Sequence, residues 1–267
     1  SVVVNVANPT VTIPTVSQID CQVVEQTLTA SVSTSAATTI AYAWNVVGNR
    51  TSTMTVTEGG VYSVEVTDKG NYCTATAEVS VVKDVEMPTV DIPAVAQIDC
   101  INTSQILTAN AHIANTNIQY IWNDNSNNQT LTVSTSGTYS VTVKDLDNKC
   151  SVETSRVVTK DTQVPTVTIP AVAQIDCANP NRTLSANAQG KNLTYSWSNG
   201  DTKSTLVVAD NKVYSVTVTD NDNGCIQTAS QSVAVNTVSP TIVIPTVERV
   251  DCTNPSQVLV AQVTIAN

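Results

Sequence analysis

Seven cysteines recur at regular intervals, and they are the residues of this sequence best suited to chemistry. A zinc site would need Cys-x-x-Cys pairs or several histidines, whereas the sequence has no such pair and His112 is its one histidine. A catalytic thiol needs a base such as His beside it, and no His accompanies the recurring cysteines. Regular cysteines in an acidic, lysine-poor chain therefore predict disulfides formed in an oxidising compartment. The seven are Cys21, Cys73, Cys100, Cys150, Cys177, Cys225 and Cys252.

The spacing of these cysteines leaves two ways of pairing them open. Bridges between neighbouring repeats would follow if the two cysteines of one repeat lay at opposite poles of its fold. Bridges within a repeat would each close a loop of about 50 residues, worth roughly 4 kcal/mol in the chain-entropy model. We expect the second arrangement, with these pairs: Cys21–Cys73, Cys100–Cys150 and Cys177–Cys225, leaving Cys252 without a partner in this sequence.

Carboxylates also recur close to the predicted junctions between repeats. Oxygen ligands gathered at such junctions suit Ca²⁺, which takes 6–8 of them, so a weak calcium site is the alternative to our prediction that the chain has no cofactor. The same residues also stabilise turns without any metal. The carboxylates are Asp84, Asp161, Asp99, Asp176, Asp145 and Asp220.

The spacing of the cysteines shows the length of the repeat whose strands must position them. Cys21, Cys100, Cys177 and Cys252 follow one another at nearly equal intervals, and each follows Asp in a similar setting. Such repeats decide the architecture. The segments that we expect are a last strand of a preceding repeat at 1–8, complete repeats at 9–87, 88–164 and 165–239, and the first part of a further repeat at 240–267.

Inside each repeat the apolar residues alternate with Thr, Ser and charged residues at a period of two. This pattern predicts antiparallel strands with one buried and one wet face. Seven short strands with one Trp on the third are typical of an immunoglobulin-like sandwich. We therefore predict an all-β fold of tandem immunoglobulin-like sandwiches in a linear array. Its core anchors are Trp44, Trp122, Trp197, Tyr62, Tyr139 and Tyr214.

Three sequence elements also resemble a known group of repeats. They are Tyr195-Ser-Trp197-Ser-Asn-Gly200, the strand from Tyr214 to Asp220, and Asn223-Gly224-Cys225, with counterparts in the other two repeats. They resemble the PKD-like and Ig-like repeats of giant Bacteroidota surface adhesins, which include gliding-motility adhesins and filaments exported by the type IX system. The likeness covers nearly the whole chain. One departure is Lys212, which replaces the glycine found at Gly60 and Gly137, so we expect a different turn there.

This resemblance implies an extracellular, cell-surface protein used for adhesion or filament building. Its partners would be further repeats or copies of itself, and a surface ligand that the sequence does not identify. A glycan- or protein-binding module that uses the variable loops is the alternative. The junctions hold two prolines and no glycine, which favours a semi-rigid string of sandwiches.

Composition narrows the remaining function classes. A net charge of −10 argues against nucleic acid as a partner. No apolar run is long enough for a membrane span. No catalytic triad, metal cluster or phosphate loop is visible in the sequence, so we do not expect an enzyme.

Overall fold

β-Branched and small apolar residues alternate with polar ones along this chain, and the alternation builds strands with one buried face. The computed structural model describes residues 6–113 and 117–265. The chain divides into two compact units, one of residues 1–96 with 104–158 and one of residues 97–103 with 159–267. The regular elements of the described residues are all strands. No helix in this part of the chain is long and apolar enough to cross a membrane.

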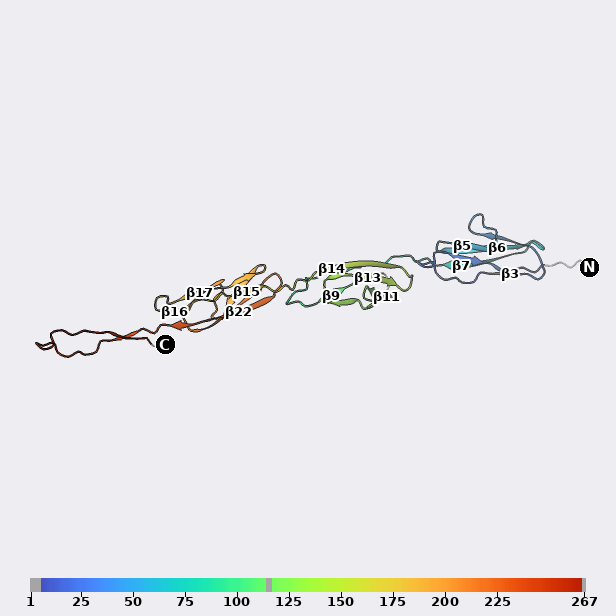
Figure 1. The fold of residues 1–267 in the computed structure, drawn as a ribbon. Coiled ribbons are helices and arrows are strands. Elements are labelled where there is room, and N and C mark those ends of the chain that lie inside the picture. Colours follow the sequence, from blue (N-terminus) through green and yellow to red (C-terminus); the bar gives the residue numbers. More distant parts are fainter. Residues whose placement is uncertain (1–5, 114–116, 266–267) are drawn as a thin grey trace, which may run out of the picture. The chain divides into compact units, whose positions relative to one another are not determined.

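The first sandwich of unit 1 has two antiparallel layers (Figure 1). One layer pairs β1 with β3 and β2 with β5, and Ala30 alone separates β2 from β3. The other layer has the order β4-β6-β7, and a parallel bridge from Ile19 to Lys83 extends it. The strands are β1 (Thr10–Thr12), β2 (Gln26–Thr29), β3 (Ser31–Ser33), β4 (Ile40–Trp44), β5 (Thr53–Val56), β6 (Gly60–Asp68) and β7 (Thr74–Val81).

The second sandwich of unit 1 repeats this succession. Its pairs are β8 with β10 and β9 with β12 in one layer, and its other layer has the order β11-β13-β14. The strands are β8 (Thr89–Asp91), β9 (Gln105–Thr108), β10 (Asn110–His112), β11 (Ile118–Trp122), β12 (Thr130–Val133), β13 (Gly137–Asp145) and β14 (Ser151–Val158). Identical registers follow from identical spacing of the inward-facing residues.

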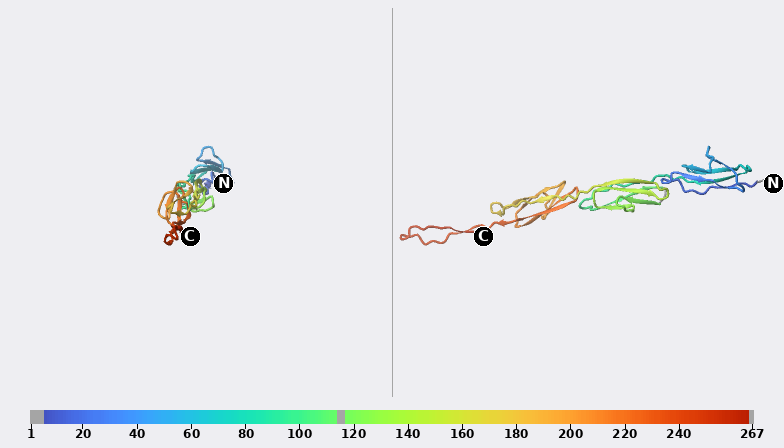
Figure 2. Two further views of the ribbon diagram at one scale, coloured as in Figure 1. Left: turned by 60° about the vertical axis from the view of Figure 1, so that its left-hand side comes forward. Right: turned by 45° about the vertical axis from the view of Figure 1, so that its right-hand side comes forward.

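Unit 2 contains a third sandwich with the same pairing, and Figure 2 shows it from two further sides. Here the parallel bridge lengthens into a short pair, β16 with β23. The strands are β15 (Thr166–Thr168), β16 (Ile175–Asp176), β17 (Arg182–Ser185), β18 (Asn187–Gln189), β19 (Leu193–Trp197), β20 (Thr205–Val208), β21 (Lys212–Asp220), β22 (Ile226–Val233) and β23 (Val235–Asn236). Tandem immunoglobulin-like antiparallel sandwiches are therefore the fold class of the chain.

The two ends of the expected array differ from a full sandwich. After Pro240, β24 (Thr241–Val243) and β25 (Gln262–Thr264) pair as an isolated hairpin whose apolar side chains are exposed. Residues 6–8 of the strand expected at 1–8 form no strand, and residues 1–5 lie outside the described residues.

One tryptophan fills the centre of each sandwich. Trp44, Trp122 and Trp197 are 6%, 1% and 2% exposed. A buried indole N–H needs an acceptor, and each Nε1 donates to a backbone carbonyl six or seven residues later: Thr51, Asn128 and Lys203, at 2.9, 2.9 and 2.8 Å. The indole thus ties each sandwich together through packing and one hydrogen bond.

The tyrosines that follow differ between sandwiches for a local reason. Tyr62 and Tyr139 are half-buried, whereas Tyr214 is 3% exposed. The ammonium of Lys212 lies 4.9 Å from the centre of the Tyr214 ring, so the lysine side chain covers the tyrosine. At Lys212 the turn contains a hydrogen bond from the Lys212 N–H to the Asp210 carbonyl, at 3.1 Å, whereas β21 itself pairs in the same register as β6 and β13 do from their glycines.

Candidate functional site

A tight turn presents the first cysteine of each repeat. In unit 1 one carboxylate oxygen of Asp20 accepts the backbone N–H groups of Gln22 and Val23, at 2.8 and 2.7 Å, around Cys21. The carboxylates of Asp99, Asp176 and Asp251 accept the equivalent two N–H groups. Asp suits this position because its short side chain reaches back to the N–H groups of its own turn. We call Cys21, Cys100, Cys177 and Cys252 the loop cysteines.

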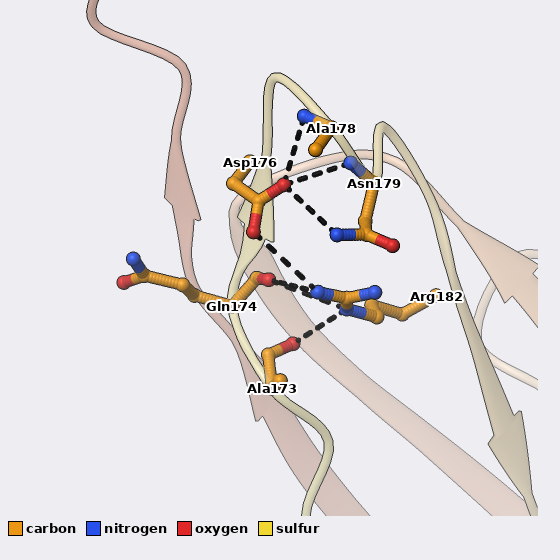
Figure 3. A network of polar contacts seen from close by, with 6 residues as sticks. All are labelled: Ala173, Gln174, Asp176, Ala178, Asn179 and Arg182. Carbon is orange, nitrogen blue, oxygen red and sulfur yellow. Dashed lines mark hydrogen bonds and ion pairs between the residues drawn. The ribbon is translucent and has the colours of Figure 1, made fainter.

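The Cys177 turn shows how firmly this loop is built (Figure 3). The Asp176 carboxylate holds the N–H groups of Ala178 and Asn179, and its second oxygen lies 3.8 Å from the Arg182 guanidinium. Arg182 also donates to the carbonyls of Gln174 and Ala173. The hydrogen bond from the Asn179 side chain is the main reason that the pKa of Asp176 is lowered.

A second turn presents the other cysteine of each repeat, between its two longest strands. In the second sandwich the Asp145 N–H donates to the Cys150 carbonyl at 2.9 Å, and the Asn148 Oδ1 accepts the Cys150 N–H at 3.0 Å. The residue between them, Lys149, has a φ of 62°. Tyr72 and Gly224 occupy the same place with φ values of 59° and 67°. We call Cys73, Cys150 and Cys225 the turn cysteines.

Within unit 1 the loop of the first sandwich meets the turn of the second. Cys21 and Cys150 form a disulfide with a Cα–Cα distance of 5.0 Å. The Cys21 N–H donates to the Asn148 carbonyl at 3.1 Å. The Asn148 amide donates to the Asp84 carboxylate and the Glu86 carbonyl, both at 2.9 Å. One asparagine therefore binds the loop and the connecting segment together.

Unit 2 contains the same arrangement with different residues. Cys100 and Cys225 form a disulfide with a Cα–Cα distance of 5.1 Å. The Asn223 amide donates to the Asp161 carboxylate and the Gln163 carbonyl, both at 3.0 Å, and its backbone carbonyl accepts the Cys100 N–H at 3.1 Å. Hydrogen bonds from the Gln163 N–H and from Asn223 lower the pKa of Asp161. We call these two arrangements the Cys21–Cys150 and Cys100–Cys225 junctions.

The expected pairing within a repeat is wrong, and the geometry of one strand explains why. Cys73 directly precedes β7, whereas the bridge from Ile19 to Lys83 places the Cys21 loop just beyond the other end of β7. An eight-residue strand is about 26 Å long, so the two cysteines lie too far apart for a disulfide. Bridges between the cysteines of neighbouring repeats, the other arrangement that the spacing allows, are the ones that form.

Three of the predicted disulfide cysteines have no disulfide partner in the described part of the chain. These are the turn cysteine Cys73 and the loop cysteines Cys177 and Cys252. The Asn71 side chain beside Cys73 already donates to the Ala7 carbonyl at 2.9 Å, much as Asn148 donates to Glu86. We call the sites of these three cysteines half-junctions, because each has the turn or the loop of a junction without its disulfide.

The carboxylates considered as weak calcium ligands form hydrogen bonds within the protein. Asp84 and Asp161 accept an asparagine amide at the junctions, and Asp99 and Asp176 close the loop-cysteine turns. Asp145 and Asp220 are buried and close the turn-cysteine turns. Nowhere in residues 6–113 and 117–265 do three acidic, His or Cys side chains group as metal ligands would.

The asparagine of the junction is the functional residue that the sequence analysis missed. Its signal is present as an Asn-x-Cys triplet at every turn cysteine: Asn71-Tyr72-Cys73, Asn148-Lys149-Cys150 and Asn223-Gly224-Cys225. Asn148 and Asn223 are 1% and 2% exposed, which is unusual for so polar a side chain and requires that its hydrogen bonds be satisfied.

Comparison with known proteins adds solved structures but no family. No protein-family model matches the sequence, and no curated protein matches it. Among solved structures, Sidekick-1 immunoglobulin domains 1–5 align with 86% of this chain at 12% identity and a TM-score of 0.36, and the chain spans 60% of that structure.

Two further solved structures have nearly the same length as the aligned region. The titin I-band fragment I67–I69 aligns over 87% of this chain and 100% of its own, at 12% identity and a TM-score of 0.47. Three N-terminal domains of the bacteriophage RB49 outer capsid protein Hoc align over 85% and 99%, at 15% identity and a TM-score of 0.39. The fold assignment rests on the strand order of the chain itself.

Proposed function

We propose that this chain is a structural and adhesive stalk segment of an extracellular protein. The observation that carries the proposal is the recurrence of one covalent junction, in which a loop cysteine is bonded to the turn cysteine of the next repeat. Neighbouring repeats are thus connected twice, by the backbone and by a disulfide. A double connection serves a protein that must transmit force, whereas it contributes nothing to a chemical reaction.

The compartment follows from the same bonds. Disulfides persist in oxidising surroundings outside the cytoplasm, and the turn cysteines Cys150 and Cys225 are each 1% exposed. Thiol–disulfide exchange needs access to the attacked sulfur, so burial protects the turn cysteine of each bond, whereas the loop cysteines Cys21 and Cys100 are exposed. These points support an extracellular location.

The finer assignment extends the sequence resemblance. We place the chain in a bacterial surface adhesin or filament of the Bacteroidota type, exported by the type IX system and used for attachment or gliding. Further repeats of the same protein, or copies of it in a filament, would be its partners. The repetition of scaffold residues in all three sandwiches supports a role in reach and mechanical strength.

The test is made on cells that produce the protein. Brief protease treatment of intact cells should release fragments of this chain, and non-reducing peptide mapping of them should return Cys21–Cys150 and Cys100–Cys225 peptides. Cells carrying Cys21→Ser with Cys100→Ser should detach from a surface at lower flow than the parent strain. Cells carrying His112→Gln, an exposed change in one repeat, should detach like the parent.

Two results would remove the proposal. One is a chain that is protected from protease in intact cells and carries only reduced thiols. The other is attachment strength that does not change when both junction disulfides are lost.

A further inference from the structure

The two disulfides overlap along the sequence. The bond between Cys21 and Cys150 spans 129 residues and encloses Cys100, while the bond between Cys100 and Cys225 spans 125 residues and encloses Cys150. The two covalent loops therefore share the segment from Cys100 to Cys150. This follows from each loop cysteine being bonded to the turn cysteine of the repeat that comes next.

We infer that this overlap is a covalent stop on extension, an inference that rests on the proposed function as a stalk. Tension applied at the two ends is carried by the shortest covalent path. From Cys21 the path crosses to Cys150, returns along the shared segment to Cys100, and crosses to Cys225. The whole backbone between Cys21 and Cys225 is about four times as long as the shared segment, so most of it never becomes taut.

The difference in length is large. An extended chain spans at most about 3.3–3.6 Å per residue, so the shared segment reaches about 170 Å and the free backbone would reach about 700 Å. Even with every sandwich unfolded, the stalk between these cysteines extends to about a quarter of its backbone length. An ordinary tandem array without such bonds has no such limit.

The stop also determines which parts of the chain bear load. When β1 is pulled out of the first sandwich, force passes from Cys21 directly to Cys150, and the strands β2 to β7 are bypassed. In the same way, force reaching Cys225 leaves along β22 without loading β15 to β21. The ends of each bypassed segment lie at the two disulfides, so the shared segment keeps them from separating beyond its own length, and the bypassed segments never become fully extended.

The pattern of partial removal is specific to this topology. If the Cys100–Cys225 bond is removed, the shortest path runs through the remaining bond and then along the backbone from Cys150 to Cys225. If the Cys21–Cys150 bond is removed instead, the path follows the backbone from Cys21 to Cys100 and then crosses to Cys225. Each of these paths is about one and a half times as long as the shared segment. Only the loss of both bonds makes the whole backbone between Cys21 and Cys225 taut.

The experiment is single-molecule stretching of the whole chain from its two ends. Four oxidised proteins are compared: the parent, Cys21→Ser with Cys150→Ser, Cys100→Ser with Cys225→Ser, and the variant with all four changes. The fully unfolded contour should rise by about 90–100 Å in each two-residue variant and by about 500–550 Å in the four-residue variant. A control with Cys73, Cys177 and Cys252 changed to Ser should match the parent.

The inference is overturned if a two-residue variant already lengthens several times more than this expectation, by over about 300 Å, or if the four-residue variant matches the parent. Both results would mean that the bonds do not overlap in this way. The measurement uses the isolated chain, so it can succeed even if the protein is not found at a cell surface. A failure of the proposed function is therefore distinguishable from a failure of this inference.

Discussion

Gly224 shows how one residue adapts a junction to its neighbour. A Cβ at Gly224 would lie 2.4 Å from the Cδ1 of Ile101, the residue after Cys100, and the φ of Gly224 is +67°. In the other junction the same place holds Lys149, and the residue after Cys21 is the polar Gln22. The Ile101 side chain therefore occupies the space that a side chain at position 224 would need.

We predict that Gly224→Leu prevents the Cys100–Cys225 bond from closing in a large part of the molecules. The new side chain would clash with Ile101, and a leucine at this position would have to adopt a strained left-handed backbone conformation. Quantitative thiol labelling with peptide mapping would measure the fraction oxidised. Adding Ile101→Ala should restore much of it, while Lys149→Leu in the other junction serves as the matched control. Full oxidation of Gly224→Leu would contradict this account.

Asn148 connects three segments: its side chain bonds to the connecting segment and to its own turn, and its backbone carbonyl accepts the Cys21 N–H. We predict that Asn148→Ala lowers the free energy of unfolding by about 1–3 kcal/mol, because it removes the amide hydrogen bonds to Asp84 and Glu86 and leaves the buried Cys150 N–H without its acceptor. Urea unfolding would measure the loss. Asn71→Ala, at the half-junction, removes the amide hydrogen bond to Ala7 from a less buried side chain and should cost clearly less. Equal losses would mean that the Asn148 contacts to Asp84 and Glu86 add nothing.

At the scale of single residues, the sequence predicts which side chains are buried better than it predicts which residues they contact. The Trp and Tyr positions follow from period-two alternation, since burial is a local property of a strand. The partner of Asn148 is 64 residues away at Asp84, and no local pattern encodes such a distance. The repeated Asn-x-Cys triplet marks the residue as special without saying what it binds.

Among the elements, the loop that carries a loop cysteine depends on one ionised carboxylate. Hydrogen bonds from the Asn102 and Ile101 N–H groups hold the pKa of Asp99 below its ordinary value of 3.8. A lowered pKa means that the folded state favours the charged form, so the stabilisation is complete near neutral pH. It is lost as the pH falls below 3.8 through the pKa of the folded state.

We therefore predict that the Cys100 loop loosens in acid while the strands persist. Protection of the Ile101 and Asn102 amides from hydrogen exchange, corrected for the intrinsic rate, should fall below about pH 3.8. Asp99→Asn keeps an acceptor but cannot titrate, so its protection should not depend on pH in that range. A parent protein without the acid step would show that the carboxylate charge does not hold the loop.

The strands themselves were the easier elements to predict. Alternation of apolar and polar residues predicts strands such as β6, β13 and β21, because each buries every second residue. The parallel bridge from Ile19 to Lys83 was not predicted. Its segment is short, follows Pro14 and lacks alternation, so only the tertiary structure assigns it to a sheet.

For the whole molecule, the repeat period predicts the architecture but not which cysteines are bonded to each other. The expected pairing joined the two cysteines of one repeat, whereas the observed bonds span 129 and 125 residues. Which pole of a sandwich a cysteine occupies depends on the path of the chain around both sheets. That path is a property of the complete fold, and spacing alone does not contain it.

The long spans have a thermodynamic consequence that belongs to the whole chain. A bridge of about 50 residues would contribute roughly 4 kcal/mol by restricting the unfolded state, and one of about 130 residues roughly 5 kcal/mol. We predict that Cys21→Ser with Cys150→Ser lowers the free energy of unfolding by about 5 kcal/mol, and that Cys100→Ser with Cys225→Ser does nearly the same. Denaturant titration of the oxidised proteins, followed by tryptophan fluorescence, would measure both losses, since each sandwich holds one buried indole.

Replacing Cys73, Cys177 and Cys252 with Ser should leave the titration unchanged. A loss below about 1 kcal/mol for either pair would show that the bridge does not restrict the unfolded chain as its span requires.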